Sequence, residues 1–155
     1  MTLHSILSLA VLVTVAALTA ARASAQPPAP AGDTLSVRLT GIPAASGQVL
    51  VAVYASAESW LDTAEVAHYA FPDALAGEQI VRIPGVAPGR YAVAVVHDAD
   101  SSGDITTGFF GIPEEAYGFS NDARGRLGPP DFDEAVVEWG GAGEEVVVRV
   151  KKFGS

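Results

Sequence analysis

The chain contains no cysteine among its 155 residues. It therefore has no disulfide, no thiol nucleophile, no thiolate metal ligand and no cysteine to acylate, and its hydrophobic core must supply stability unaided. Basic residues are also scarce, with 9 Lys and Arg against 18 Asp and Glu and a net charge of −9. Such an acidic surface repels nucleic acid and anionic lipid headgroups, so we expect neither as a partner.

The N-terminus is free of acidic residues and begins with an apolar segment. Leu3 to Ala21 is uncharged and dominated by Leu, Val and Ala, and Arg22 precedes the small-x-small triplet Ala23-Ser24-Ala25. This pattern predicts a cleavable secretory signal peptide over residues 1–25. A retained membrane anchor is the alternative, since the apolar stretch approaches spanning length, but no basic cluster follows it. We therefore expect an exported protein, periplasmic or extracellular, with no membrane span after cleavage.

The Pro- and Ala-rich residues 26–32 are expected to form a tether, and residues 33–153 a single domain. Residues 34–40 alternate polar and apolar side chains, which is typical of a strand with one buried face. Residues 48–54 are apolar on both faces and predict a central strand, paired antiparallel with the first. Further strands are expected at 79–83, 91–97, 135–139 and 144–152.

Gly and Pro divide the predicted strands, with a break at Pro84-Gly85 and a hairpin turn expected at 140–143. Residues 57–70 have some helical spacing and predict a loop with a short helix. Residues 98–134 are rich in Gly and Pro, have little periodicity and predict a long loop. The fold class expected is all-β: a single antiparallel β-sandwich of about seven strands with this long loop and one short helix.

Three segments carry a family resemblance: residues 88–98, residues 111–121 and the run Pro-Pro-Asp-Phe-Asp-Glu-Ala at 129–135. With them the chain resembles, over roughly residues 34–152, the bacterial exported family called domain of unknown function 2141. The resemblance implies an exported sandwich and no established activity. The Pro-Gly-x-Tyr turn also resembles transthyretin-type and carboxypeptidase-regulatory-type sandwiches. The chain departs from the family at Thr106 and Gly108, where the family has Asp and Asn, which removes two oxygen ligands from any shared ion site.

The loop after the strand over 91–97 offers side-chain oxygens at every second position, from Asp98, Asp100, Ser102 and Asp104. Ca²⁺ takes six to eight oxygen ligands, and this spacing can wrap several around one point. The loop opens like an EF-hand but lacks the Glu at its twelfth position, so Glu114 or Glu115 would have to fold back; we include Glu115 in the predicted Ca²⁺ site. In the alternative, these residues form Asx-type turns and Gly103 adopts a positive φ.

Tyr117, Ser120 and Asn121 combine aromatic, hydroxyl and amide groups and are candidate ligand-binding residues for a sugar or peptide. In the alternative, the aromatic residues of the long loop, Phe119 and Phe132 among them, pack it onto the sheets. The segment around Ser120 lacks the second glycine of a nucleophile elbow, and no catalytic residue is assigned.

We therefore expect an exported, non-catalytic binding or structural module whose partner is an envelope component or a glycan. A carboxylate-dependent envelope hydrolase or transferase using the loop over 98–122 is the alternative.

Overall fold

The computed structural model describes residues 32–103, 115–125, 128–141 and 143–152. The predicted signal peptide and all of the tether except Gly32 lie outside this range. Among the described residues, no helix has the length and apolar character needed to cross a membrane.

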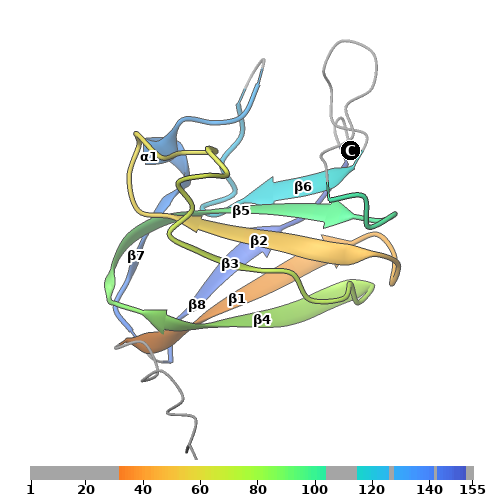
Figure 1. The fold of residues 1–155 in the computed structure, drawn as a ribbon, viewed down its shortest axis with the longest axis horizontal. Coiled ribbons are helices and arrows are strands. Elements are labelled where there is room, and N and C mark those ends of the chain that lie inside the picture. Colours follow the sequence, from red (N-terminus) through yellow and green to blue (C-terminus); the bar gives the residue numbers. More distant parts are fainter. Residues whose placement is uncertain (1–31, 104–114, 126–127, 142, 153–155) are drawn as a thin grey trace, which may run out of the picture.

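The described chain forms two β-sheets that face each other (Figure 1). The three-stranded sheet has the order β4 (Gly77–Val86), β1 (Asp33–Ile42), β8 (Glu145–Arg149). The five-stranded sheet has the order β3 (His68–Ala70), β2 (Gln48–Tyr54), β5 (Gly89–Asp98), β6 (Ala116–Phe119), and β7 (Val136–Trp139) also pairs with β5. One short helix, α1 (Phe132–Ala135), precedes β7 in the described chain. The predicted all-β sandwich is confirmed, with eight strands in the described residues.

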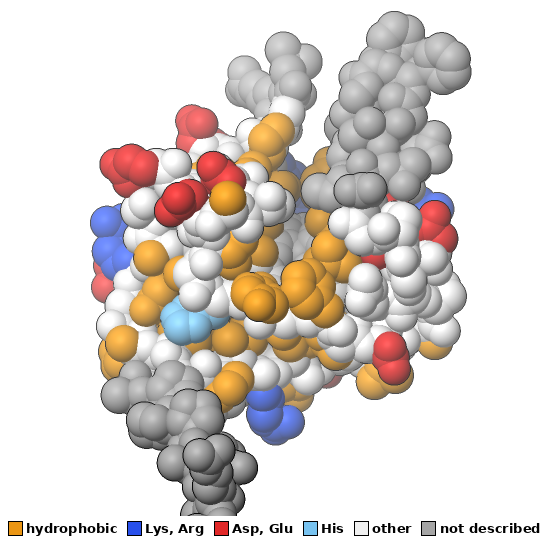
Figure 2. All heavy atoms as spheres, in the orientation of Figure 1, with side chains coloured by type: hydrophobic (Ala, Val, Ile, Leu, Met, Phe, Trp, Pro, Cys, Tyr) orange, Lys and Arg blue, Asp and Glu red, His pale blue; other side chains and the backbone are white. Residues whose placement is uncertain are grey.

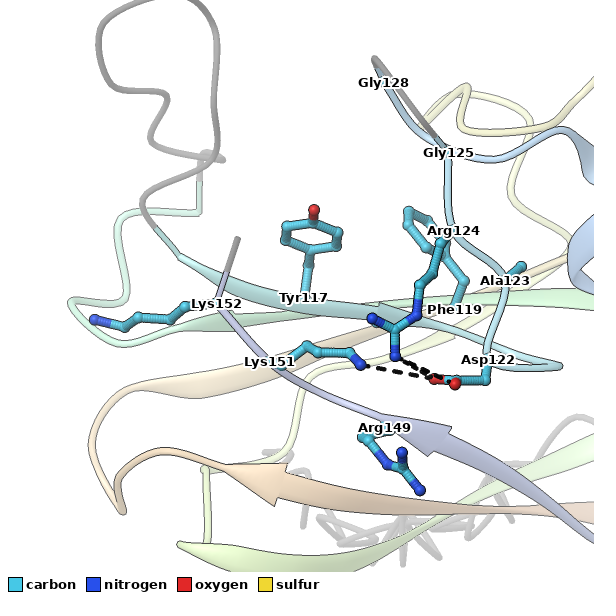
Figure 3. Close-up of a pocket in the computed structure, with 11 residues that line it drawn as sticks. Tyr117, Phe119, Asp122, Ala123, Arg124, Gly125, Gly128, Arg149, Lys151 and Lys152 are labelled. Atoms are coloured by element: carbon cyan, nitrogen blue, oxygen red, sulfur yellow. Dashed lines mark hydrogen bonds and ion pairs between the residues drawn. The ribbon is translucent and has the colours of Figure 1, made fainter. Parts of the chain in front are cut away.

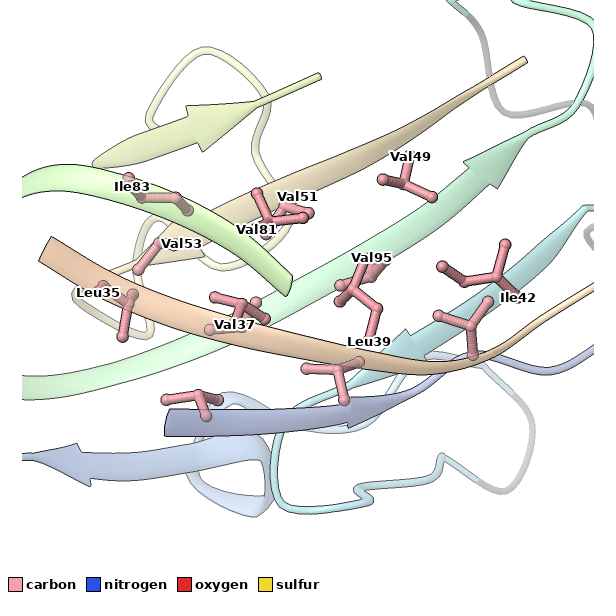
Figure 4. Packing of buried hydrophobic residues seen from close by; sticks show 14 of the residues in the cluster. Leu35, Val37, Leu39, Ile42, Val49, Val51, Val53, Val81, Ile83 and Val95 are labelled. Atoms are coloured by element: carbon pink, nitrogen blue, oxygen red, sulfur yellow. The ribbon is translucent and has the colours of Figure 1, made fainter. Parts of the chain in front are cut away.

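The core lies between the sheets and follows the alternation of the sequence (Figure 4). Leu35, Val37 and Leu39 of β1 are completely buried, and Val49 and Val51 of β2 face them from the other sheet. Removing each of these side chains from water stabilises the fold by about 1.5–3 kcal/mol. This apolar layer takes the place of the absent disulfides.

Two predicted pairings are wrong. β1 and β2 belong to different sheets: β1 pairs antiparallel with β4 and parallel with β8, so the sandwich is not purely antiparallel. The strands on either side of the hairpin turn expected at 140–143 do not pair with each other either, because β7 pairs with β5 while β8 pairs with β1 in the opposite sheet. The alternation of polar and apolar side chains indicates which face of a strand is buried, but it does not determine which strand lies next to it in the sheet.

The short helix is not where its pattern was expected. Residues 55–67 form bends and turns and lead into β3, whereas the helix is α1. The Glu134 carboxylate accepts a hydrogen bond from the Asp131 backbone N–H at 3.0 Å, as in a capping box. The Asp-x-x-Glu spacing at 131–134 was the local signal for this helix, and the helical spacing over 57–70 was misleading.

A second apolar cluster covers the outer face of the five-stranded sheet. Trp60 is at its centre, with ring centroids 5.2 Å from Tyr54, 5.7 Å from Phe119 and 5.9 Å from Phe132. The Trp60 indole N–H donates to the Pro130 carbonyl oxygen at 2.8 Å. The predicted packing role is therefore confirmed for Phe119 and Phe132.

β4 is an outer strand of the three-stranded sheet, and β3 is an outer strand of the five-stranded sheet. Pro84 is accommodated within β4 because an outer strand needs no hydrogen bond from every backbone nitrogen. The predicted strand 79–83 is thus extended at both ends. Hydrophobic side chains are exposed on the face that carries β3 (Figure 2), where Tyr69 and Phe71 have ring centroids 5.2 Å apart.

Candidate functional site

The candidate site lies at the rim of the sandwich, where β5 ends. Asp98 is the last residue of β5 and is 1% exposed. Its Oδ1 accepts a hydrogen bond from the Ser102 backbone N–H at 3.0 Å, and its Oδ2 accepts one from Gly103 N–H at 2.9 Å and one from Gln48 Nε2 at 3.3 Å. The loop after β5 therefore folds back over a buried carboxylate.

These hydrogen bonds determine the charge state of Asp98. Burial by itself acts to raise the pKa of this carboxyl, but the donors from Gly103, Gln48 and Ser102 outweigh it and lower the pKa below its ordinary value. Asp98 is thus ionised at neutral pH although it is almost inaccessible to water. An ionised oxygen donor is what a metal ion requires.

Two further carboxylates approach Asp98. Ligand atoms of Asp98, Asp100 and Glu115 all lie within 4.8 Å of one another. Asp100 is exposed, whereas Glu115 is half-buried and its Oε2 is shielded from solvent. Asp98 and Glu115 lie at opposite ends of the connection between β5 and β6, so the fold brings together groups that are distant in sequence. Three carboxylates this close repel one another unless a cation neutralises them, and this triad can hold a metal ion.

A pocket of about 330 Å³ opens beside the triad, lined in part by Asp100 and Glu115. His97 also lines it, and its Nε2 lies 2.9 Å from the Ser46 carbonyl oxygen. Lys152 lines the same pocket and adds a positive charge to its wall. A metal ion entering from this side would therefore compete with an ammonium group.

The turn interpretation of the loop is confirmed by its geometry. Asp100 Oδ1 accepts a hydrogen bond from the Ser102 backbone N–H at 3.1 Å, which is an Asx-type turn, and Gly103 has the expected positive φ of 77°. Ser102 contributes its backbone N–H to both neighbouring carboxylates. Asp104 and Glu114 lie outside the described residues. The turn chemistry shapes the loop, and the same folding places Asp100 beside Asp98.

Ser120, predicted as a ligand-binding residue, lies in the interior instead. It is 0% exposed, its Oγ accepts a hydrogen bond from the Val93 backbone N–H at 2.8 Å, and it donates one to the Ala135 carbonyl oxygen at 2.5 Å. Strands β6 and β7 lie end to end along β5, and Val93 is positioned between their pairing segments. The Ser120 hydroxyl therefore bridges this junction and does not face a ligand.

The other two predicted ligand-binding residues remain accessible to different degrees. Asn121 is exposed, and its Nδ2 donates to the Glu134 carbonyl oxygen at 2.9 Å, which ties it to α1. Tyr117 is half-buried and lines a second pocket. That pocket also contains Arg124, Arg149 and Lys151, which the sequence interpretation did not include. The basic residues at 149–152, in an otherwise acidic chain, were the sequence signal for Arg149 and Lys151, whereas Arg124 lies outside that run.

Comparison with known proteins gives one match. The family model described as "Uncharacterized protein conserved in bacteria (DUF2141)" matches residues 37–147, more than two thirds of the chain. No curated protein and no solved structure matches. The transthyretin-type resemblance therefore stays a prediction.

Proposed function

Because the chain belongs to this family of uncharacterized bacterial proteins, whose description gives no activity, we propose its function from the site itself. We propose an exported, non-catalytic β-sandwich module of the bacterial envelope whose rim binds Ca²⁺ through Asp98, Asp100 and Glu115. The observation that carries this proposal is the approach of the three carboxylates to within 4.8 Å of one another. Carboxylate oxygens are the ligands that hard divalent cations prefer, and loop carbonyls and water complete a Ca²⁺ shell.

The position of the triad supports a stabilising role for the ion. Asp98 ends β5, and Glu115 immediately precedes β6. An ion bound to both would tie together the two ends of the intervening segment, residues 99–114. It would also relieve the repulsion among the carboxylates, so binding would favour the folded state.

The lowered pKa of Asp98 argues against a role as general acid. A general acid at neutral pH needs a raised pKa, whereas hydrogen bonds lower the pKa of Asp98 and keep it ionised. The hydrolase or transferase alternative gains no support from this arrangement. The proposed partner class remains an envelope component or a glycan, with Tyr117 as its candidate contact.

The test is thermal unfolding of the purified protein in EDTA, in Ca²⁺ and in Mg²⁺. At a Ca²⁺ concentration 100 times Kd, binding stabilises the folded state by about 2.7 kcal/mol, which raises Tm by roughly 5–10 °C. Glu115→Gln and Asp100→Asn should abolish the shift. Glu65→Gln is the matched control, because Glu65 is exposed in the turns before β3 and is not part of the triad.

Either of two results would refute the site. The first is an unchanged Tm on adding Ca²⁺ to the wild-type protein. The second is a Ca²⁺ shift that Glu115→Gln and Glu65→Gln retain equally, which would place the ion elsewhere on the acidic surface.

A further inference from the structure

A second pocket lies between β6, residues 149–152 and residues 122–125. Its volume is about 160 Å³, and its lining combines the aromatic side chains of Tyr117 and Phe119 with Asp122 and the basic side chains of Arg124, Arg149 and Lys151. A cavity of about 150 Å³ is known to hold a benzene molecule. The pocket thus has room for one six-membered ring.

The charge of this pocket is opposite to that of the chain. Four of the seven described Lys and Arg side chains line it, with a single carboxylate among them, in a protein of net charge −9. Figure 3 shows Arg124, Arg149 and Lys151 grouped around Asp122, while Lys152 extends away from that group. A concave surface lined by one sign of charge concentrates counter-ions, so this pocket attracts anions.

The ion pairs with Asp122 do not neutralise all of the positive charge of the basic side chains in this pocket. Arg124 lies 3.3 Å and Lys151 4.0 Å from the Asp122 carboxylate. Arg149 has no carboxylate within 4.0 Å in the described part of the chain, although it still acts on Asp122 electrostatically. Partial burial works to raise the pKa of Asp122, yet the three cations lower it. The potential in the pocket is therefore positive even with Asp122 present.

The backbone holds these side chains in place. Tyr117 N–H donates to the Lys151 carbonyl oxygen at 3.0 Å, and Lys151 N–H donates to the Tyr117 carbonyl oxygen at 2.9 Å. The two sheets are thus joined along this side of the pocket. At Gly118 a Cβ would clash with the Arg149 carbonyl oxygen, so only glycine permits this approach.

The turn that presents Asp122 is equally well defined. Asn121 and Asp122 have φ of 59° and 48°, and Ala123 N–H donates to the Ser120 carbonyl oxygen at 3.2 Å. Positive φ at both central residues is the signature of a type I′ turn, in which Asn and Asp are favoured. The turn directs Asp122 towards the basic side chains.

Two aromatic rings provide the apolar part of the pocket. Tyr117 and Phe119 project from the same face of β6, with ring centroids 5.8 Å apart (Figure 3). Ligand pockets typically combine apolar or aromatic walls with a few charged groups that fix the orientation of the ligand. The lining here suits a molecule with a ring and an anionic substituent.

We propose that this pocket binds a small organic anion composed of a six-membered ring and one carboxylate, with the carboxylate at Arg124 and Arg149 and the ring against Tyr117 and Phe119. A sugar acid and an aromatic acid share this chemistry. The pocket is separate from the rim triad apart from Lys152, which lines both pockets, and it does not require the Ca²⁺ proposal.

The test is calorimetric titration of the whole protein with glucuronate, benzoate, neutral glucose and inorganic phosphate, with EDTA throughout so that the outcome is independent of Ca²⁺. At least one ring acid should bind at millimolar concentration, and more weakly as salt is added. The preferred acid identifies the sugar or the aromatic class. Glucose and phosphate should bind at least about tenfold more weakly, because glucose lacks the carboxylate and phosphate lacks the ring.

Variants separate a binding site from a surface ion pair. Arg149→Gln and Arg124→Gln should each weaken binding about tenfold, the usual effect of losing one charge-assisted hydrogen bond. Arg90→Gln is the matched control, because this exposed arginine lies outside the pocket. Asp122→Asn should tighten binding, since it removes the competing anion, whereas a purely structural ion pair would show only a change in stability.

Three outcomes would overturn the proposal. The first is that neither ring acid binds at millimolar concentration. The second is that glucose binds as well as glucuronate, and the third is that Arg149→Gln and Arg90→Gln weaken binding equally. Tm of each variant is measured in parallel, so that unfolding is not mistaken for lost affinity. Asp122→Asn, with its expected gain, is a change that misfolding cannot mimic.

Discussion

Replacing Ser120 by alanine removes the hydroxyl that joins β6 and β7 along β5. The hydroxyl is completely buried and makes two hydrogen bonds, one with the Val93 N–H and one with the Ala135 carbonyl oxygen. Alanine fits the same space but leaves both backbone groups buried without this partner. A buried polar group that loses its partner costs about 1–3 kcal/mol, so the Ser120→Ala change should destabilise the protein by about 2–4 kcal/mol. In a domain of this size that lowers Tm by roughly 10 °C.

The free energy of unfolding is measured by urea denaturation, and amide hydrogen exchange reports on the junction itself. Exchange at Val93 should accelerate more than exchange at core amides of β1. Ser36→Ala is the matched control, because Ser36 is a half-buried strand serine whose hydroxyl has no hydrogen bond within the described residues. A loss below about 1 kcal/mol for Ser120→Ala, or a loss equal to that of Ser36→Ala, would refute this role for the hydroxyl.

Three further predictions concern the core and the two sites. Asp98 has a lowered pKa in the folded protein, so its ionised form stabilises the fold at pH values above the ordinary pKa of 3.8, and this stabilisation disappears as pH falls through the lower folded pKa. The difference in Tm between wild type and Asp98→Asn should therefore shrink from pH 5 towards pH 2. A difference that stays constant over this range would contradict the prediction. Gly118→Ala should lower the free energy of unfolding by about 1–3 kcal/mol, because the added Cβ would press on the Arg149 carbonyl oxygen. An unchanged free energy of unfolding in chemical denaturation would contradict this prediction. Leu39→Ala should cost about 2–5 kcal/mol in the same assay, since this side chain is 0% exposed between the sheets, and a loss below 1 kcal/mol would show that the core there is loose.

The sequence alone was sufficient to predict the elements that bury one face. The alternation over 34–40 gave β1, and the apolar run over 91–97 gave β5, which the structure pairs on both edges. The Asx-type turn at Asp100 and the positive φ of Gly103 were also predictable, because both depend on interactions within a few residues. Interactions within a turn and the periodicity of a strand can therefore be predicted from the sequence alone.

Strand partners and the composition of both sites depended on the tertiary structure. The parallel pairing of β1 with β8 and the assignment of β7 to the other sheet follow from edge-to-edge hydrogen bonds, which any backbone can make. Ser120 was predicted from its chemical type as a surface ligand, but its position between β6 and β7 makes it a buried bridge. Local patterns could not indicate this, because its partners belong to two other elements.

The absence of cysteine excluded disulfides, and the excess of acidic residues gave the chain its negative net charge. The fold decided which charged residues lie together. The sequence identified Asp98 and Asp100 as neighbours in a loop, but only the return of the chain at β6 adds Glu115 to them. The four basic residues that line the second pocket are likewise separated in sequence, between positions 124 and 152, and only the joining of β6 to the chain after β8 brings them into one pocket. Sequence spacing governs contacts along a strand or turn, whereas contacts between segments depend on how the two sheets close over the core.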